Sequence, residues 1–315
     1  MIRLLCLIAI FPLLFACSDA PQKVLKIGSN VWPGYEFYYM ARDKGYLDPD
    51  KVRLVEFSNA TDVSRELLNG HVDGALLTLD EAVRLSVLGL KLKVIQIVDF
   101  SRGGDVVMAQ KKITNNTQFK GKSVAVEGSA VGALMLTAFK EHYKIKDSDL
   151  KVEYISVDES EQAYKKGADF IISFEPFRTL LLNLGAKQVF DTSYVPNLIV
   201  DVLVVREDAI AKHTEQQFKY LVDAYFRALS EYESSPMDSA KILSKRLKIT
   251  PQEVIESYEG IAPAQLNENH SLLLGESPEL LHSIEDISDI LRESKLIDGQ
   301  VKASTLILAD YLPKK

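Results

Sequence analysis

Residues 25–39 read LKIGSNVWPGYEFYY, and this stretch decides the class of fold. The apolar run at 25–28 predicts a strand, and the Pro-Gly pair at 33–34 predicts a turn that leads into a helix over 36–44. Open α/β sheets bind ligands beyond the carboxyl ends of their strands, where such loops and helix starts converge. The stretch therefore predicts an α/β fold with a candidate binding loop between strand and helix.

The same strand-then-helix pattern continues along the chain. Further strands are predicted at 52–57, 74–77, 92–98, 106–109, 123–126, 152–155, 170–173 and 202–205. The helices predicted between them cover 62–68, 80–88, 131–143, 160–165 and 176–184. From residue 208 onward we expect the strands to stop and helices to follow one another, over 215–232, 237–246, 251–258 and 278–293. These patterns predict an α/β protein of two lobes with a helical C-terminal tail, and the paired glycines in residues 101–104 mark a candidate junction.

Composition excludes several classes of protein. The chain has 315 residues with 47% apolar and 26% charged residues, which is ordinary globular composition. It carries 37 Lys and Arg against 44 Asp and Glu, a net charge of −7, whereas nucleic-acid binding usually requires a basic surface. The five histidines are scattered without metal-ligand spacing, and no phosphate loop, dinucleotide fingerprint or nucleophile elbow is present. We expect no catalytic residues, no metal, no cofactor and no nucleic-acid partner.

The amino terminus has the pattern of a targeting segment. After Arg3 comes an almost continuous apolar run over 4–15, too short to span a bilayer but suited to a signal-peptide core. Its ending, Leu-Phe-Ala-Cys at 14–17, resembles a bacterial lipobox. That resemblance implies that residues 1–16 are a lipoprotein signal peptide and that Cys17 carries lipid, which includes palmitate, as a membrane anchor. The alternative is an ordinary secretory signal with an incidental cysteine, since Phe15 is bulky for its position.

Two helix starts near the amino terminus offer candidate ligand contacts. Trp32, the only tryptophan, and Tyr35 lie on the loop side of the Pro-Gly turn, where their rings can stack on a flat ligand. The alternative for Trp32 is a core aromatic residue. Thr78 and Asp80 follow the strand predicted at 74–77. Because Glu81 stands three residues after Thr78, the alternative there is a capping box that only starts a helix.

Three further candidates occupy similar places later in the chain. Ser129 lies in a Gly-Ser turn after the strand at 123–126, where small residues let backbone amides approach a polar ligand group. Glu175 precedes Pro176 at a helix start, with Arg178 available to pair with it. Asp201 stands ahead of the apolar run at 202–205, and its alternative role is to cap the start of that strand.

The order and spacing of these segments, with others between them, resemble the periplasmic solute-binding proteins of ABC importers. The similar segments are 32–36, 41–47, 56–62, 70–75, 78–81, 127–133, 174–176 and 201–205. More narrowly, the chain is similar to the family that binds nitrate, alkanesulfonates, taurine and thiamine-precursor pyrimidines. The resemblance implies a type II periplasmic binding protein fold in which each lobe is a mostly parallel sheet flanked by helices. Lobe one is expected to comprise 23–102 plus 203–315, and lobe two 103–202.

The resemblance also implies what the chain binds and where. A small solute would lie in the cleft between the lobes, which close by a hinge motion, and the closed, monomeric protein would dock on ABC permease subunits outside the cytoplasm. The residues expected to face the cleft are Trp32, Tyr35, Thr78, Asp80, Ser129, Glu175 and Asp201, with Glu81 and Glu127 as neighbours.

The acidity of those positions bears on the ligand. A dry cleft does not hold unpaired carboxylates cheaply, so an amine-bearing, flat solute such as an aminopyrimidine is favoured. A taurine-like zwitterion comes second. Bare nitrate or an alkanesulfonate is disfavoured, because such an anion requires Arg, Lys or backbone amides. Another alternative is a ligand-sensing receptor for a membrane signalling protein. Members of the family that synthesise the pyrimidine carry a cysteine-rich motif, which this chain lacks.

Overall fold

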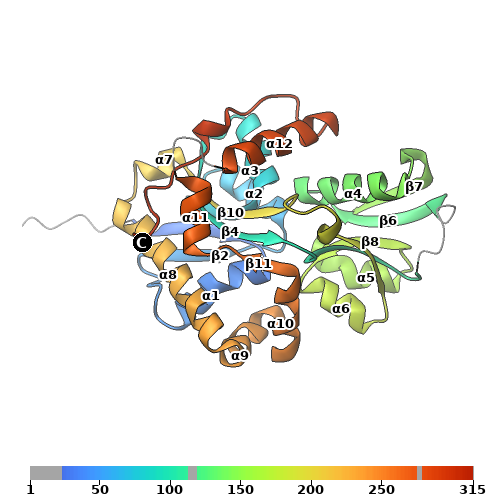
Figure 1. The fold of residues 1–315 in the computed structure, drawn as a ribbon, viewed down its shortest axis with the longest axis horizontal. Coiled ribbons are helices and arrows are strands. Elements are labelled where there is room, and N and C mark those ends of the chain that lie inside the picture. Colours follow the sequence, from blue (N-terminus) through green and yellow to red (C-terminus); the bar gives the residue numbers. More distant parts are fainter. Residues whose placement is uncertain (1–22, 113–118, 275–278, 315) are drawn as a thin grey trace, which may run out of the picture.

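The structure is a computed structural model that describes residues 23–112, 119–274 and 279–314. The predicted signal peptide and Cys17 lie outside the described residues. Figure 1 shows two lobes side by side, each built on its own sheet, with helices on both faces. The predicted two-lobed α/β fold is confirmed.

The first sheet has six strands in the order β11-β4-β10-β3-β1-β2. Their bounds are β1 Leu25–Ser29, β2 Val52–Glu56, β3 Gly74–Thr78, β4 Leu92–Ser101, β10 Val200–Arg206 and β11 Ile261–Pro263. The strands β1, β2 and β3 are parallel, while β10 runs antiparallel to both β3 and β4. The strand β10, which comes much later in the chain, is therefore inserted between β3 and β4, so segments far apart in the sequence share one sheet.

The second sheet repeats this plan with five strands in the order β7-β6-β8-β5-β9. Their bounds are β5 Asp105–Ala109, β6 Lys122–Glu127, β7 Leu150–Ile155, β8 Phe170–Phe174 and β9 Lys187–Asp191. The strands β6, β7 and β8 are parallel, and β5 lies antiparallel between β8 and β9. In both lobes the carboxyl ends of the parallel strands point toward the junction, which places their loops there.

Helices cover both faces of each sheet, as the alternating pattern requires. Their bounds are α1 Glu36–Asp43, α2 Ala60–Leu68, α3 Leu79–Val87, α4 Ala130–Tyr143, α5 Ser160–Lys165, α6 Phe177–Asn183, α7 Glu207–Ile210, α8 Glu215–Ser234, α9 Pro236–Leu247, α10 Pro251–Ser257, α11 Leu266–Leu273 and α12 Leu280–Glu293. Figure 1 shows α4 on one side of the second sheet and α5 and α6 on the other. The second sheet accordingly buries apolar side chains on both faces, in two separate clusters.

The chain crosses between the lobes twice, after β4 and again before β10. The two crossings touch, because the Ser101 Oγ lies 2.8 Å from the Thr192 Oγ1 and the Gly103 N–H donates to the same Thr192 oxygen at 2.7 Å. The division into 23–102 plus 203–315 and 103–202 stays a prediction. Its second boundary falls inside β10, which begins at Val200.

Two expectations about local structure were wrong or incomplete. The strands do not stop at residue 208, because β11 pairs with the edge of β4 at Ser101, Phe100 and Asp99. Three residues are too few to show a periodic pattern, so this strand exists through its partner rather than its own sequence. The strand β9 and the helix α11 were not predicted either, since both are rich in polar residues.

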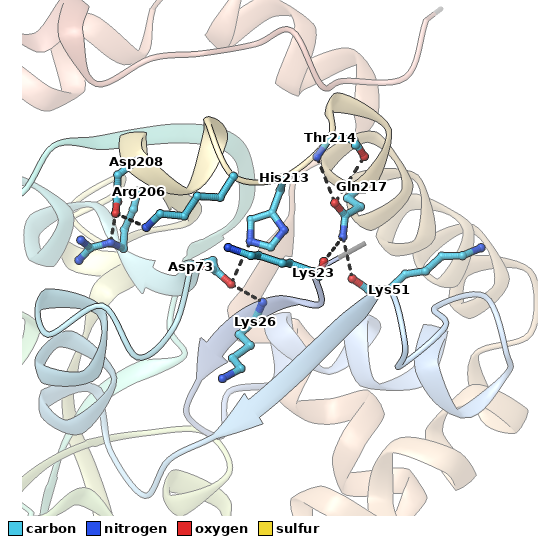
Figure 2. Close-up of polar contacts among 10 residues, drawn as sticks. Lys23, Lys26, Lys51, Asp73, Arg206, Asp208, His213, Thr214 and Gln217 are labelled. Carbon is cyan, nitrogen blue, oxygen red and sulfur yellow. Dashed lines mark hydrogen bonds and ion pairs between the residues drawn. The ribbon is translucent and has the colours of Figure 1, made fainter. Parts of the chain in front are cut away.

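The described chain starts at the amino end of β1, where polar contacts fix it (Figure 2). The Gln217 side chain donates from Nε2 to the carbonyl oxygens of Lys23, at 2.8 Å, and Lys51, at 3.1 Å. The Lys26 N–H donates to the Asp73 Oδ2 at 2.9 Å. Because β1 runs from here toward the junction, the start of the folded body and the predicted binding loop lie at opposite ends of this strand. Among the helices of the described ranges, none is long and apolar enough to cross a membrane.

Candidate functional site

The loop after β1 is held against the end of β4. It contains a short 3-10 helix, Pro33–Tyr35, that begins with proline. The Trp32 Nε1–H donates to the Asp99 Oδ2 at 3.0 Å, and the Trp32 side chain is only 4% exposed. A Cβ on Gly34 would lie 1.8 Å from the same Asp99 oxygen, so this close approach requires glycine. The loop therefore brings the indole ring to the junction in a fixed position.

A row of polar side chains crosses three neighbouring strands beside this loop. The register places Asp201 of β10 opposite Thr78 of β3 on one side and opposite Asp99 of β4 on the other. Directly opposite residues share one face of a sheet, so the three side chains point the same way. The register shifts next to Asp201, and such an irregularity re-aims side chains at the end of a strand. The Tyr35 hydroxyl donates to the Asp201 Oδ1.

The start of α3 adds two more buried acids. Thr78 is the N-cap residue of α3, yet its side chain makes no capping hydrogen bond. The alternative given for this pair, a capping box, is not supported by the Thr78 side chain, and both Thr78 and Glu81 line the pocket. Asp80 is fully buried and neither of its carboxyl oxygens has a hydrogen-bond partner.

The second lobe contributes the opposite wall. Asp105, the first residue of β5, is 4% exposed, and its Oδ2 has no partner. The Phe174 ring at the end of β8 meets the Trp32 ring edge-on, with 5.8 Å between ring centres and 80° between planes. The Glu127 Oε1 at the end of β6 accepts from the Thr61 N–H of the first lobe at 3.2 Å.

These side chains enclose one pocket between the lobes. Its lining consists of Asn30, Trp32, Tyr35, Ala60, Thr78, Glu81, Asp105, Val131, Phe174, Ile199 and Asp201. The cavity is about 20 Å³, and a buried water needs roughly 10–15 Å³, so the lobes are closed on a space of about one water. Two further bonds span the lobes, from the Asn59 Nδ2 to the Ser156 Oγ at 3.0 Å and from the Asn183 Nδ2 to the Glu253 Oε1 at 2.8 Å.

The predicted site residues divide into two groups. Those that line the pocket are Trp32, Tyr35, Thr78 and Asp201, together with the predicted neighbour Glu81. The others are absent from the lining: Asp80, Ser129, Glu175 and the neighbour Glu127.

Local hydrogen bonds account for the positions of two residues outside the pocket lining, Ser129 and Glu175. The Ser129 Oγ accepts from the Gly132 N–H at 3.1 Å, which makes it the N-cap of α4. The Glu175 Oε1 accepts from the Arg178 guanidinium at 2.8 Å, as predicted for this pair, and its Oε2 accepts from the Thr179 N–H.

Asp99 and Asp105 were not among the predicted site residues. Each stands at the end of an apolar strand beside the crossing, and Asp105 follows the Gly103-Gly104 pair directly. The signal that was available is a charged residue bounding a strand next to paired glycines. It is weak by itself, since strands are often bounded by acidic residues.

Burial dominates the electrostatics of the site. It raises the pKa of Asp80 to about 6, of Asp105 to about 7 and of Asp99 to about 8. Burial also raises the pKa values of Glu81 and Asp201 well above their ordinary range. None of the lining residues, all within the described part of the chain, is Arg, Lys or His. The pocket thus holds several acids that need either protons or a cation from outside.

The arrangement can bind a flat molecule with N–H donors. The rings of Trp32, Tyr35 and Phe174 supply apolar walls, and the carboxyl groups accept N–H donors or, when protonated, donate to a ring nitrogen. In the described ranges, no three His, Cys, Asp or Glu side chains are grouped in a way that could hold a metal ion.

Comparison with solved structures identifies the fold. The ligand-binding component of an ABC-type import system from Staphylococcus aureus, described with zinc bound, is 19% identical with a TM-score of 0.73, covering 92% of this chain and 98% of that one. The alkanesulfonate-binding protein SsuA from Xanthomonas axonopodis pv. citri, bound to MOPS, is 15% identical with a TM-score of 0.76, covering 92% and 99%.

A third similar structure is the periplasmic aliphatic sulphonate binding protein SsuA from Escherichia coli. It is 16% identical with a TM-score of 0.71, covering 91% of this chain and 92% of that one. At such identities the likeness shows the fold alone, which is the type II periplasmic binding protein fold implied by the sequence. No protein of curated description matches the chain.

A match to the sequence identifies the family. The model of the family described as NMT1/THI5 like matches residues 32–239, which is more than half of the chain and includes both walls of the pocket. With the two-lobed fold and the closed interlobe pocket, this match places the chain in the NMT1/THI5-like family.

Proposed function

We propose that the chain is an extracytoplasmic solute-binding protein that captures a small, polar, amine-bearing organic solute and delivers it to the permease of an ABC importer. An aminopyrimidine-like solute is the first choice. One observation carries the proposal. The pocket between the lobes is lined by Glu81, Asp105 and Asp201, and no basic residue is in its lining. The lining residue Trp32 also donates a hydrogen bond to another buried acid, Asp99.

The free energy of burying these acids supports an amine-bearing ligand. An isolated buried carboxylate is costly, and the penalty is relieved by a counter-charge or by hydrogen bonds. Arg178, the one arginine in residues 103–202, already pairs with Glu175. A ligand amine, amidine or protonated ring nitrogen supplies the missing positive charge and several N–H donors.

A flat ligand is favoured by the aromatic side chains. Trp32 and Phe174 come from different lobes and meet edge-on, so a planar ring inserted between the lobes contacts both. The cavity of about 20 Å³ has no room for such a ring, so capture requires the lobes to move apart and to close again around the ligand.

A taurine-like zwitterion is the second candidate, because its ammonium group suits the same carboxyls. Its sulfonate would have to rely on Asn30, Thr78 and backbone N–H groups. The neighbours that are described as sulfonate-binding proteins favour testing this class.

The similar solved structures support a role in import over a role in signalling or catalysis. One is described as a component of an ABC-type import system, and the sulfonate-binding neighbours are binding proteins. A receptor subunit for a membrane signalling protein and a pyrimidine-synthesising enzyme remain the alternatives. Turnover of an aminopyrimidine by the purified protein would favour the enzyme.

We also propose that lipid on Cys17 tethers the protein to a bacterial membrane. The described part of the chain begins at Lys23, at the end of β1 far from the binding loop, so a lipid on Cys17 would join the protein on the side away from the pocket. Replacing Cys17 by serine should move the protein from the membrane fraction to the soluble fraction. An unchanged membrane fraction for Cys17→Ser would contradict the anchor.

A ligand panel tests the binding proposal. The purified protein is heated with 4-amino-2-methylpyrimidine, taurine or ethanesulfonate. A ligand at a hundred times its Kd stabilises the folded state by about 2.7 kcal/mol, which raises the Tm by several degrees. We expect the largest rise with the aminopyrimidine, a smaller rise with taurine and none with ethanesulfonate. The rise should disappear in Asp201→Asn and persist in Asp223→Asn, a change at an exposed position of α8. Stabilisation by ethanesulfonate alone would overturn the proposal.

A further inference from the structure

We propose that Asp105 couples capture of a cationic solute to closure of the lobes, with a proton able to take the place of the solute in the empty protein. The solute part of this inference rests on the proposed function, whereas the proton part concerns the empty protein alone.

Asp105 stands where closure brings the two lobes together. It is the first residue of β5 and follows the first crossing segment directly, so its carboxyl belongs to the second lobe. Its N–H donates to the Ser101 Oγ at 3.1 Å, and that oxygen lies 2.8 Å from the Thr192 Oγ1 of the second crossing. The backbone of Asp105 is thus fixed at the hinge, while the residue lines the pocket with a carboxyl whose Oδ2 has no partner.

The groups that face Asp105 across the junction are mostly acidic. They are Tyr35 from the loop after β1, Asp80 and Glu81 from α3, Asp99 from β4 and Asp201 from β10, while Glu175, paired with Arg178, stands on its own lobe beside β5. The charge of Asp80 raises the pKa of Asp105, and the charge of Asp105 raises that of Asp201. Closing the empty pocket therefore moves like charges of two lobes together and out of water.

Neutralisation decides whether the lobes close. In an open cleft these carboxyls meet water and ionise near their ordinary pKa of about 4. In the closed pocket burial raises the pKa of Asp105 to about 7, so the closed form binds the proton more tightly than the open form does. Through Asp105, closure of the empty protein is consequently favoured progressively as the pH falls from about 7 toward about 4, whereas above about 7 the ionised Asp105 opposes closure to a constant extent. The closed-to-open ratio changes by up to about tenfold per pH unit for each proton taken up.

A ligand cation has the same effect as the proton at neutral pH. Placed between Asp105 and the acids of the first lobe, it neutralises both walls at once, so binding and closure become one event. A neutral or anionic molecule of the same shape leaves the repulsion in place. Asp105 would in this way make the protein close on cations and stay open without them.

The test follows the shape of the empty protein against pH. The purified full chain, freed of solute by partial unfolding and refolding, is measured by small-angle scattering and by Trp32 fluorescence between about pH 5 and about pH 9. We expect the radius of gyration to rise as the pH increases from about 5 to about 7, with a parallel change in the emission of the single tryptophan at the junction. In Asp105→Asn the closed-to-open ratio at pH 8 should rise by up to about a thousandfold over wild type, because closure no longer has to overcome a pKa difference of about three units between the open and closed forms. Asp223→Asn, the exposed control, should follow wild type.

Two results would overturn the inference. One is a radius of gyration that does not change with pH in the wild type; the other is an Asp105→Asn profile that matches wild type. Asp105→Ser, which is smaller and also neutral, is measured beside it so that a folding defect of one variant does not decide the outcome. If no amine ligand stabilises the protein, the proposed function fails while the pH profile still reports on Asp105. If ligands bind but the profile is flat, only the coupling fails.

Discussion

The hydrogen bond from Trp32 to Asp99 gives the sharpest prediction about ligand affinity. Trp32→Phe keeps an aromatic ring but removes the Nε1–H that reaches the Asp99 Oδ2 at 3.0 Å. The other oxygen of Asp99 already has no partner, so the carboxyl loses its indole donor in a fully buried place. Leaving a buried acceptor without its donor costs about 1–3 kcal/mol, so we expect the Kd to rise roughly 5- to 150-fold.

The loss of free energy in Trp32→Phe should affect the closed, ligand-bound form and not the empty protein. We expect opening of the cleft to admit water to Asp99, so the free energy of unfolding of the empty protein should fall by less than about 1 kcal/mol. The same hydrogen bond holds the pKa of Asp99 down, and without it that pKa moves above its value of about 8. Trp32→Ala also removes the edge-on contact with Phe174 and should lose about 3–5 kcal/mol of binding.

Calorimetric titration with 4-amino-2-methylpyrimidine, beside urea unfolding of the empty protein, measures both quantities. If Trp32→Phe binds within twofold of wild type, the Asp99 bond does not matter for capture. If unfolding loses as much free energy as binding does, Trp32 is a core residue and the reasoning is refuted.

Three further predictions concern stability. Arg246→Met leaves Glu36 buried without its partner at 2.8 Å, so the free energy of unfolding should fall by about 3 kcal/mol at pH 8. The loss should be smaller at pH 6, because burial raises the pKa of Glu36 to about 7 and the carboxyl is then protonated. Thermal melts at the two pH values check this. Gly260→Ala puts a Cβ 2.8 Å from the backbone of the first crossing and should lower stability by about 2 kcal/mol in urea, whereas Gly128→Ala, with no neighbour nearer than 3.6 Å, should change little. Asn269→Leu leaves an N–H and a C=O of β4 unpaired and should lower stability by about 2–4 kcal/mol, and a loss under about 0.5 kcal/mol in the same assay would contradict that role.

Much of the fold was predictable because buried strands appear in the sequence as apolar runs. The runs at 74–77, 106–109 and 202–205 lie inside β3, β5 and β10, each of which is buried over most of its length. The short strand β11 had no such signal, because only its pairing with β4 makes it a strand. The pairing of strands far apart in the sequence was likewise beyond local pattern.

The candidate site was predictable only where it follows a local rule. Trp32 and Tyr35 were found because loops after parallel strands meet at one edge of the sheet. Asp99 was missed because its place beside Asp201 depends on the register of two strands that the second lobe separates in sequence. Thr78 was predicted from its place directly after the strand at 74–77, and it lines the pocket while its side chain makes no helix-capping hydrogen bond.

The most direct test of the central claim is the identity of the solute that the protein binds in its host. Native mass spectrometry of the purified protein, followed by release and fragmentation of any bound molecule, gives this identity. The carboxyl-rich pocket predicts a small nitrogenous base that carries a positive charge or accepts a proton, in a ratio of one per chain. A sulfonate or another anion without an amine would contradict the account, because the pocket lining offers no basic side chain to receive it.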